Sequence, residues 1–258
     1  GSFASAGAAG GWRQGAREPK VSPRGQARQR ASGYPWHMTT PAPLRTVDIP
    51  RIVANARAFN LWSPDAMDIP PDEVIHGLFA ALDQCGARYL LVGGIALLHY
   101  VDGRNTEVVD LVIALDDARA VPGLDIESHD RDFARARFSG LRVDLLLTRN
   151  PLFRHVLERH GSHALDAGQP IQVADAAGLV LLKLYALPSL YRQALHDKVR
   201  LYEADIAMLI QAQGVDTDAV LTVLDAHVSP SDAAELRSIV GEIRERIARG
   251  GRFGGAGG

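Results

Sequence analysis

Apolar residues recur with two different spacings between residues 70 and 249. In "DEVIHGLFAALDQC", residues 72–85, they fall on one face at helical spacing behind an acidic start, which predicts a helix. "RYLLVGG" is a short apolar run and "TEVVDLVIAL" is rich in β-branched residues, so both predict strands, flanking a short helix over about 95–100. "RFSGLRVDLLLT" predicts two more strands around Ser139-Gly140, the second over 141–147.

Helical spacing dominates after residue 150. The pattern predicts helices over about 151–160, 175–186, 191–213, 217–227 and 231–248. Suitable N-caps stand at Asp175, at Asp216 or Thr217, and at Ser231. A mixed α/β half over roughly 70–174 followed by a helical half indicates an α+β fold.

The two ends of the chain differ from its middle. Residues 1–37 show no apolar period and are rich in Gly, Ala, Ser and Pro, so we interpret them as a disordered leader or tag. They are either a leader that runs into a start at Met38 or a disordered basic arm. Residues 250–258, "GGRFGGAGG", are expected to form a flexible tail. This leaves an α/β domain over 38–174 and a helical C-terminal domain over 175–249.

Composition narrows the class of partner. A net charge of -2 gives no overall attraction to nucleic acid or anionic lipid, so a polyanion must meet a local patch. No run of 18 apolar residues is present, which predicts no membrane partner. The single cysteine, Cys85, allows no intrachain disulfide and suits a reducing cytoplasm.

Two acids lie inside the predicted apolar strands. Asp110 and Asp144 stand on strands that can pair side by side, and carboxylates so placed hold Mg²⁺. Side chains alternate along a strand, so Val108 shares the face of Asp110 while Glu107 points the other way. Two-metal phosphoryl-transfer centres normally use three acids, and this pattern shows two.

Gly93 and Gly94 follow the first strand directly. Two residues without Cβ at a strand-to-helix turn let backbone N–H groups approach a triphosphate. The alternative is purely structural, because a tight bend also requires glycine. The P-loop pattern is absent from the chain.

The stretch "LVGGIALLHYVDGRNTEVVDLVI" closely resembles the signature of the nucleotidyltransferase superfamily with the polymerase-β-type fold, in the branch that includes the AbiEii and MenT-type toxins. That signature runs Gly-Gly-x-Ala, a short helix, then Arg-x-Thr-x-Asp-x-Asp. The matching positions are Gly93, Gly94, Ala96, Arg104, Thr106 and Asp110. "RVDLLL" looks like the strand with the third acid, Asp144. The likeness covers about 75–212 and implies a minimal nucleotidyltransferase mixed sheet with flanking helices, followed by a helical C-terminal half.

The resemblance also implies roles for individual residues. Asp110 and Asp144 would be catalytic and hold Mg²⁺, or Mn²⁺ in its place. The implied NTP-binding residues are Gly93, Gly94, Arg104, Thr106 and Lys183. Bland alternatives stay open for three of them: a surface arginine for Arg104, a local hydrogen bond for Thr106, and a lysine that snorkels from an apolar helix for Lys183.

Val108 is where this chain departs from the signature. It stands at the first metal-binding Asp, and a valine side chain cannot ligate Mg²⁺. A β-bulge that turned Glu107 inward would supply the missing acid. Otherwise the site is slow or inactive, whether by nature or by engineering.

The expected function is transfer of a nucleoside monophosphate from an NTP to an RNA 3′ end, such as that of tRNA, or to a protein hydroxyl, with activity impaired by Val108. The competing class is a catalytically silent protein that binds a nucleotide, an RNA or a partner. A third hypothesis is a toxin controlled by a cognate antitoxin.

Overall fold

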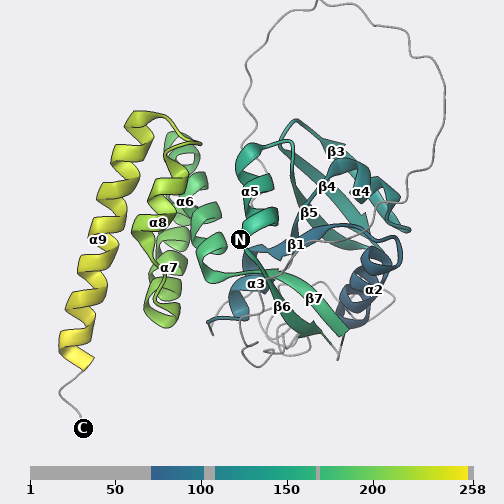
Figure 1. The fold of residues 1–258 in the computed structure, drawn as a ribbon, viewed down its shortest axis with the longest axis horizontal. Coiled ribbons are helices and arrows are strands. Elements are labelled where there is room, and N and C mark those ends of the chain that lie inside the picture. Colours follow the sequence, from purple (N-terminus) through teal and green to yellow (C-terminus); the bar gives the residue numbers. More distant parts are fainter. Residues whose placement is uncertain (1–70, 102–107, 167–168, 255–258) are drawn as a thin grey trace, which may run out of the picture. The chain divides into compact units, whose positions relative to one another are not determined.

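The computed structural model describes residues 71–101, 108–166 and 169–254. Within these residues one mixed sheet has seven strands in the order β3-β4-β5-β2-β1-β7-β6 (Figure 1). Neighbouring strands are antiparallel except for two parallel pairs, β2 with β5 and β1 with β7. The strands are β1 (Tyr89–Val92), β2 (Val109–Ile113), β3 (Leu124–His129), β4 (Phe133–Phe138), β5 (Leu141–Leu147), β6 (Gly161–Asp166) and β7 (Gln169–Ala174).

The predicted strands form the centre of this sheet. β1 and β2 are buried along their whole length, as expected for central strands covered on both faces. β4 alternates buried alanines with exposed arginines, which is typical of a strand with one face in solvent. Ser139 and Gly140 both have positive φ and join β4 to β5 in a two-residue turn, so the predicted hairpin is confirmed.

Three strands were not predicted. β3 pairs with β4 at one end of the sheet, and β6 and β7 form a hairpin whose second strand pairs in parallel with β1. β3 and β6 are largely exposed, so their sequences lack the apolar runs that identified the central strands.

Short helices flank the sheet and longer ones follow it. The helices of the first part are α2 (Pro71–Gln84), α3 (Gly93–Leu98), α4 (Leu115–Ala120) and α5 (Pro151–Arg159). Those of the second part are α6 (Ala176–Arg192), α7 (His196–Gln213), α8 (Thr217–Leu224) and α9 (Pro230–Gly254). α6 contacts the other three C-terminal helices and also reaches α3 and α5, so it joins the helical part to the sheet part.

The boundary between α6 and α7 corrects the sequence prediction. We expected one helix to stop at about residue 186, before Pro188, and the next to begin at about 191. Instead α6 continues through Pro188 to Arg192. Leu187 and Leu190 are buried beyond the expected end, and this packing outweighs the lost backbone hydrogen bond. The chain turns at Ala194, which has φ 53, and α7 begins at His196.

Side chains cap the starts of α5, α6, α8 and α9. Asp175 accepts a hydrogen bond from the Gly178 N–H at 2.7 Å, and Asp216 caps α8, as predicted. The last helix begins earlier than expected, because Ser229 rather than Ser231 accepts the Asp232 N–H. α9 ends at Gly254, past residue 250, where we placed the tail. The predictions for residues 1–37 lie outside the described residues.

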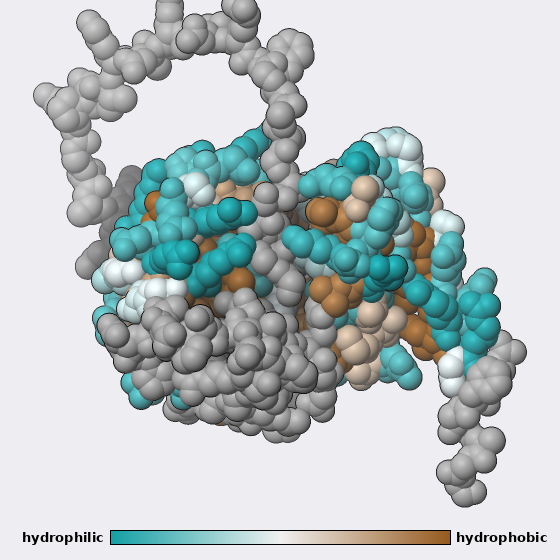
Figure 2. All heavy atoms as spheres, turned by 180° about the vertical axis from the view of Figure 1, so that it is seen from behind, coloured by the Kyte–Doolittle hydropathy of each residue, from teal (hydrophilic) through white to brown (hydrophobic). Residues whose placement is uncertain are grey.

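The described structure confirms the predicted class, an α+β fold with a mixed sheet, flanking helices and a helical C-terminal part. None of the helices in the described ranges is both long and apolar enough to cross a membrane. Figure 2 shows hydrophobic (brown) areas between hydrophilic (teal) side chains on the helical part. Polar side chains therefore alternate with apolar ones on this outer surface.

Candidate nucleotide-binding site

Asp110 and Asp144 lie side by side in the centre of the sheet. They are paired residues on the parallel strands β2 and β5, so their side chains share one face. Both are almost completely buried, with 0% and 1% of their surface exposed. Val92, the last residue of β1, is the partner of Asp110 on the other side. The predicted pairing of the two acids is therefore confirmed.

Gly93 packs directly against Asp110. It has φ +69, and a Cβ at this position would lie 2.0 Å from Oδ2 of Asp110. No side chain fits in that space, and a positive φ also favours glycine. α3 begins at Gly93 rather than at residue 95, so Gly93 and Gly94 form its first turn and both are buried. The Gly-Gly turn and the acid on β2 thus form one close-packed unit.

Arg142 binds Asp144 through two hydrogen bonds. Its Nε donates to Oδ1 at 3.1 Å and its Nη2 donates to Oδ2 at 3.0 Å. Residues two apart on a strand share a face, so this pair was visible in the predicted strand "LRVDLLL" and the sequence interpretation missed it. The bidentate guanidinium neutralises one of the two buried carboxylates.

Lys183 of α6 is buried and forms an ion pair. Its Nζ donates to Oδ2 of Asp205 on α7 at 2.8 Å and lies 4.5 Å from the centroid of the Tyr202 ring. Only 1% of the surface of Lys183 is exposed, so the alternative of a snorkelling lysine is wrong. Its role toward phosphate stays a prediction, and so does the role of Gly94.

Arg104, Thr106 and Glu107 lie outside the described residues. Val108 is half-buried and directly precedes β2. The proposed inward rotation of Glu107 therefore stays a hypothesis.

The carboxylates of the described residues do not make up a two-metal centre. Among residues 72–101, 108–166 and 169–250, no three His, Cys, Asp or Glu side chains gather as a metal-ligating group. Two acids, Asp110 and Asp144, are present, and Arg142 binds both oxygens of Asp144. Two-metal phosphoryl-transfer centres normally use three acids. The described donors therefore do not fit the two-metal centre of the signature.

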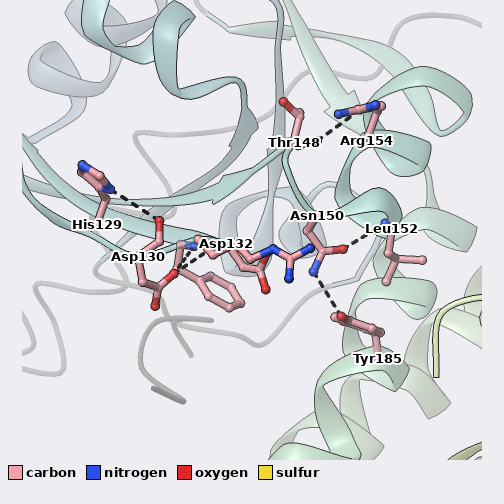
Figure 3. Close-up of polar contacts among 10 residues, drawn as sticks. His129, Asp130, Asp132, Thr148, Asn150, Leu152, Arg154 and Tyr185 are labelled. Carbon is pink, nitrogen blue, oxygen red and sulfur yellow. Dashed lines mark hydrogen bonds and ion pairs between the residues drawn. The ribbon is translucent and has the colours of Figure 1, made fainter. Parts of the chain in front are cut away.

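A pocket of about 400 Å³ lies elsewhere, between α5, α6, α7 and the start of β4. Its lining includes the aromatic residues Phe133, Phe153 and Tyr185 and none of the predicted site residues that the structure describes. In Figure 3, Asn150 caps α5 through the Leu152 N–H and points its amide at Tyr185 of α6, with an Nδ2 to hydroxyl distance of 3.1 Å. This contact fixes α5 against α6 and thereby supports one wall of the pocket.

No family model and no curated protein matches this chain. Among solved structures, the antibiotic-resistance factor ANT(2'')-Ia is similar with a TM-score of 0.44 at 15% identity, over 72% of this chain and 98% of that one. A nucleotidyltransferase-like protein from Paracoccidioides brasiliensis has a TM-score of 0.41 at 18% identity, over 64% of this chain and 91% of that one.

Terminal uridylyl transferase 4 from Trypanosoma brucei, with bound UTP, has a TM-score of 0.30 at 14% identity, over 74% of this chain and 69% of that one. These structural neighbours are nucleotidyltransferases or are named for their likeness to them. Likeness at this level assigns neither a family nor an activity to this chain.

A second buried polar cluster lies at the other end of β1. His76 of α2 contacts Oδ2 of Asp166 at 2.6 Å, and Tyr89 begins β1. Burial raises the pKa of Asp166, and the contact with His76 opposes this. Burial also raises the pKa of Tyr89, with a smaller contribution from the charge of Asp83. This cluster belongs to the packing of α2 against the sheet.

The raised pKa of Asp166 predicts a pH-dependent contribution to stability. Between its ordinary value of 3.8 and its raised value, the folded state binds more protons than the unfolded state, so this residue favours folding less as pH rises. Urea unfolding of the wild type and Asp166→Asn from pH 4 to 7 checks it. The unfolding free energy of the wild type minus that of the variant should become smaller as pH rises. A difference independent of pH would contradict the prediction.

Proposed function

We propose that this protein is a member of the nucleotidyltransferase superfamily, of the AbiEii-like branch, and that it binds an NTP beside Gly93. The observation that carries the proposal is the contact between Gly93 and Asp110, because a Cβ at residue 93 would lie 2.0 Å from the carboxylate. The contact joins Gly93 to Asp110, and the strand register pairs Asp110 with Asp144, so three positions of the signature lie together.

In this proposal the backbone of Gly93 and Gly94 approaches the triphosphate. Arg104, Thr106 and Lys183 complete the nucleotide contacts, and Asp110 and Asp144 are the catalytic acids. A hydroxyl oxygen of an RNA 3′ end or a protein side chain attacks the α-phosphorus and loses its proton to water. The bond from that phosphorus to the bridging oxygen breaks, and pyrophosphate leaves. Val108 and the Arg142–Asp144 pair reduce the negative charge of the site, so the reaction is slow.

The second candidate function is nucleotide binding without transfer. The observation that favours it is the occupation of both Asp144 oxygens by Arg142 beside a valine at position 108. A cognate antitoxin as the partner, the third hypothesis, would be sought as a copurifying protein.

Labelling with α-³²P NTPs, each supplied with Mg²⁺ or Mn²⁺, tests the reaction on total tRNA and on the protein itself. Val108→Asp is expected to raise the rate of label transfer on the order of 100-fold, because it restores a carboxylate to the reacting centre. Val108→Asn serves as the matched control, because asparagine has nearly the size of aspartate and carries no charge.

Either outcome of the labelling is informative. Transfer that Asp110→Asn abolishes in the Val108→Asp background supports the enzyme. Saturable NTP binding with no label in either protein supports the silent binder. If neither protein binds or transfers a nucleotide, the proposed function is wrong.

A further inference from the structure

Arg142 places a positive charge next to Asp144, which the resemblance implies as a metal-binding acid. Arg142 and Asp144 are two residues apart on β5, and the guanidinium covers both carboxylate oxygens. The Asp144 side chain is 2% exposed whereas that of Arg142 is 42% exposed. A carboxylate this deeply buried requires a cationic or hydrogen-bonding partner, and the guanidinium supplies both.

Arg142 and Val108 each directly precede a paired residue of the two parallel strands. Val109 pairs with Val143 and Asp110 pairs with Asp144. The signature has an acid at position 108, and this chain has an apolar side chain beside an arginine. The valine therefore makes this part of the site less negative than an acid at position 108 would.

We propose that Arg142 takes the part of the divalent cation in this protein, so that the acid pair needs no metal and nucleotide binding is independent of Mg²⁺. The guanidinium of Arg142 forms an ion pair with Asp144, the residue paired with Asp110 on the neighbouring strand. A metal ion that bound Asp144 would have to displace the bidentate guanidinium of Arg142. The part of this inference that concerns the nucleotide rests on the proposed function.

Direct binding of Mn²⁺, followed by electron paramagnetic resonance without nucleotide, tests the inference on the full chain. The wild type and Asp144→Asn should bind the same amount of Mn²⁺, because Asp144 holds no metal in the wild type. Arg142→Ala, which removes the guanidinium from Asp144, and Val108→Asp, which adds an acid, should each gain a Mn²⁺ site. In the Arg142→Ala background, Asp144→Asn should abolish the gained site.

Two controls separate charge from damage to the fold. Arg142→Lys keeps the cation and should gain no Mn²⁺ site. Arg137→Ala removes the arginine opposite Arg142 on β4, which binds Glu127 instead of Asp144, and should also gain none. Circular dichroism checks the folding of each variant. A Mn²⁺ site in the wild type that depends on Asp144, or none in both Arg142→Ala and Val108→Asp, would overturn the inference.

Calorimetry of ATP binding, with Mg²⁺ or with EDTA, tests the second half of the proposal. The wild type should give the same affinity under both conditions, while Val108→Asp should bind roughly tenfold more tightly with Mg²⁺. A wild type that binds ATP only with Mg²⁺ would overturn the inference. If no variant binds ATP, the proposed function fails, and the Mn²⁺ measurement still decides the role of Arg142.

Discussion

Gly93→Ala is expected to lower the free energy of unfolding by about 3 kcal/mol. Two costs add at this position. The backbone has φ +69, which disfavours any residue with a Cβ, and the new methyl group would lie 2.0 Å from Oδ2 of Asp110. Asp110 is fully buried on a central strand, so neither the carboxylate nor the strand can move away cheaply. Urea unfolding followed by circular dichroism measures the loss.

Gly86→Ala is the matched control for this change. Gly86 has nearly the same backbone angle, φ +67, and no atom lies within 4 Å of the Cβ it would gain. It should therefore lose only the backbone part, roughly 1 kcal/mol. Equal losses in the two variants would show that the contact between Gly93 and Asp110 does not constrain the site. The proposed function also requires NTP affinity to fall in Gly93→Ala and to stay unchanged in Gly86→Ala.

Lys183→Met is expected to cost about 3–5 kcal/mol of stability, because it leaves the buried Asp205 carboxylate without its ammonium partner. The side chain of Lys183 is 2% exposed and that of Asp205 is 0% exposed, and Nζ of Lys183 lies 2.8 Å from Oδ2 of Asp205. Methionine has nearly the length of lysine, so lost packing contributes little. The same urea unfolding measurement checks the prediction.

The double variant Lys183→Met/Asp205→Leu separates the charge from the packing. Replacing both partners with apolar side chains should recover most of the lost stability, because no unpaired charge then remains. Lys198→Met is a control on α7, where Lys198 is half-buried and makes no hydrogen bond or ion pair with the described residues; its loss should be small. A Lys183→Met variant as stable as Lys198→Met would contradict the buried ion pair.

The ion pair also bears on the predicted nucleotide role of Lys183. The carboxylate of Asp205 on α7 binds the ammonium group of Lys183 and neutralises its charge. Contact with a phosphate would therefore require the ammonium to be shared between Asp205 and the nucleotide. Asp205→Asn keeps the size of the side chain and removes its charge, so it should strengthen NTP binding if Lys183 meets phosphate.

Much of the fold follows from local sequence. β1 is a continuous apolar run, β2 and β5 are apolar apart from their charged site residues, and the Ser139-Gly140 turn between β4 and β5 has positive φ. Alternation along a strand predicts that Asp110 and Val108 share a face. The pairing of Asp110 with Asp144 required only that two apolar strands lie side by side.

Other features depend on contacts between distant segments. β6 and β7 lack a strong apolar pattern and pair with each other along their length. β7 joins this hairpin to the rest of the sheet by pairing with β1, which lies far earlier in the chain. Pro188 reads locally as the end of a helix, yet burial of Leu187 and Leu190 against the rest of the molecule carries α6 past it. Local propensity is weak beside such packing.

The sequence by itself determined the fold class, the glycine turn and the acid pair, because these depend on periodicity and on residues with special backbone or charge properties. Only the tertiary structure decided the partners of the buried charges. Arg142 was predictable from its spacing to Asp144, whereas the choice of Asp205 for Lys183 depends on how α6 packs on α7. A buried charge requires a partner, and packing decides which residue provides it.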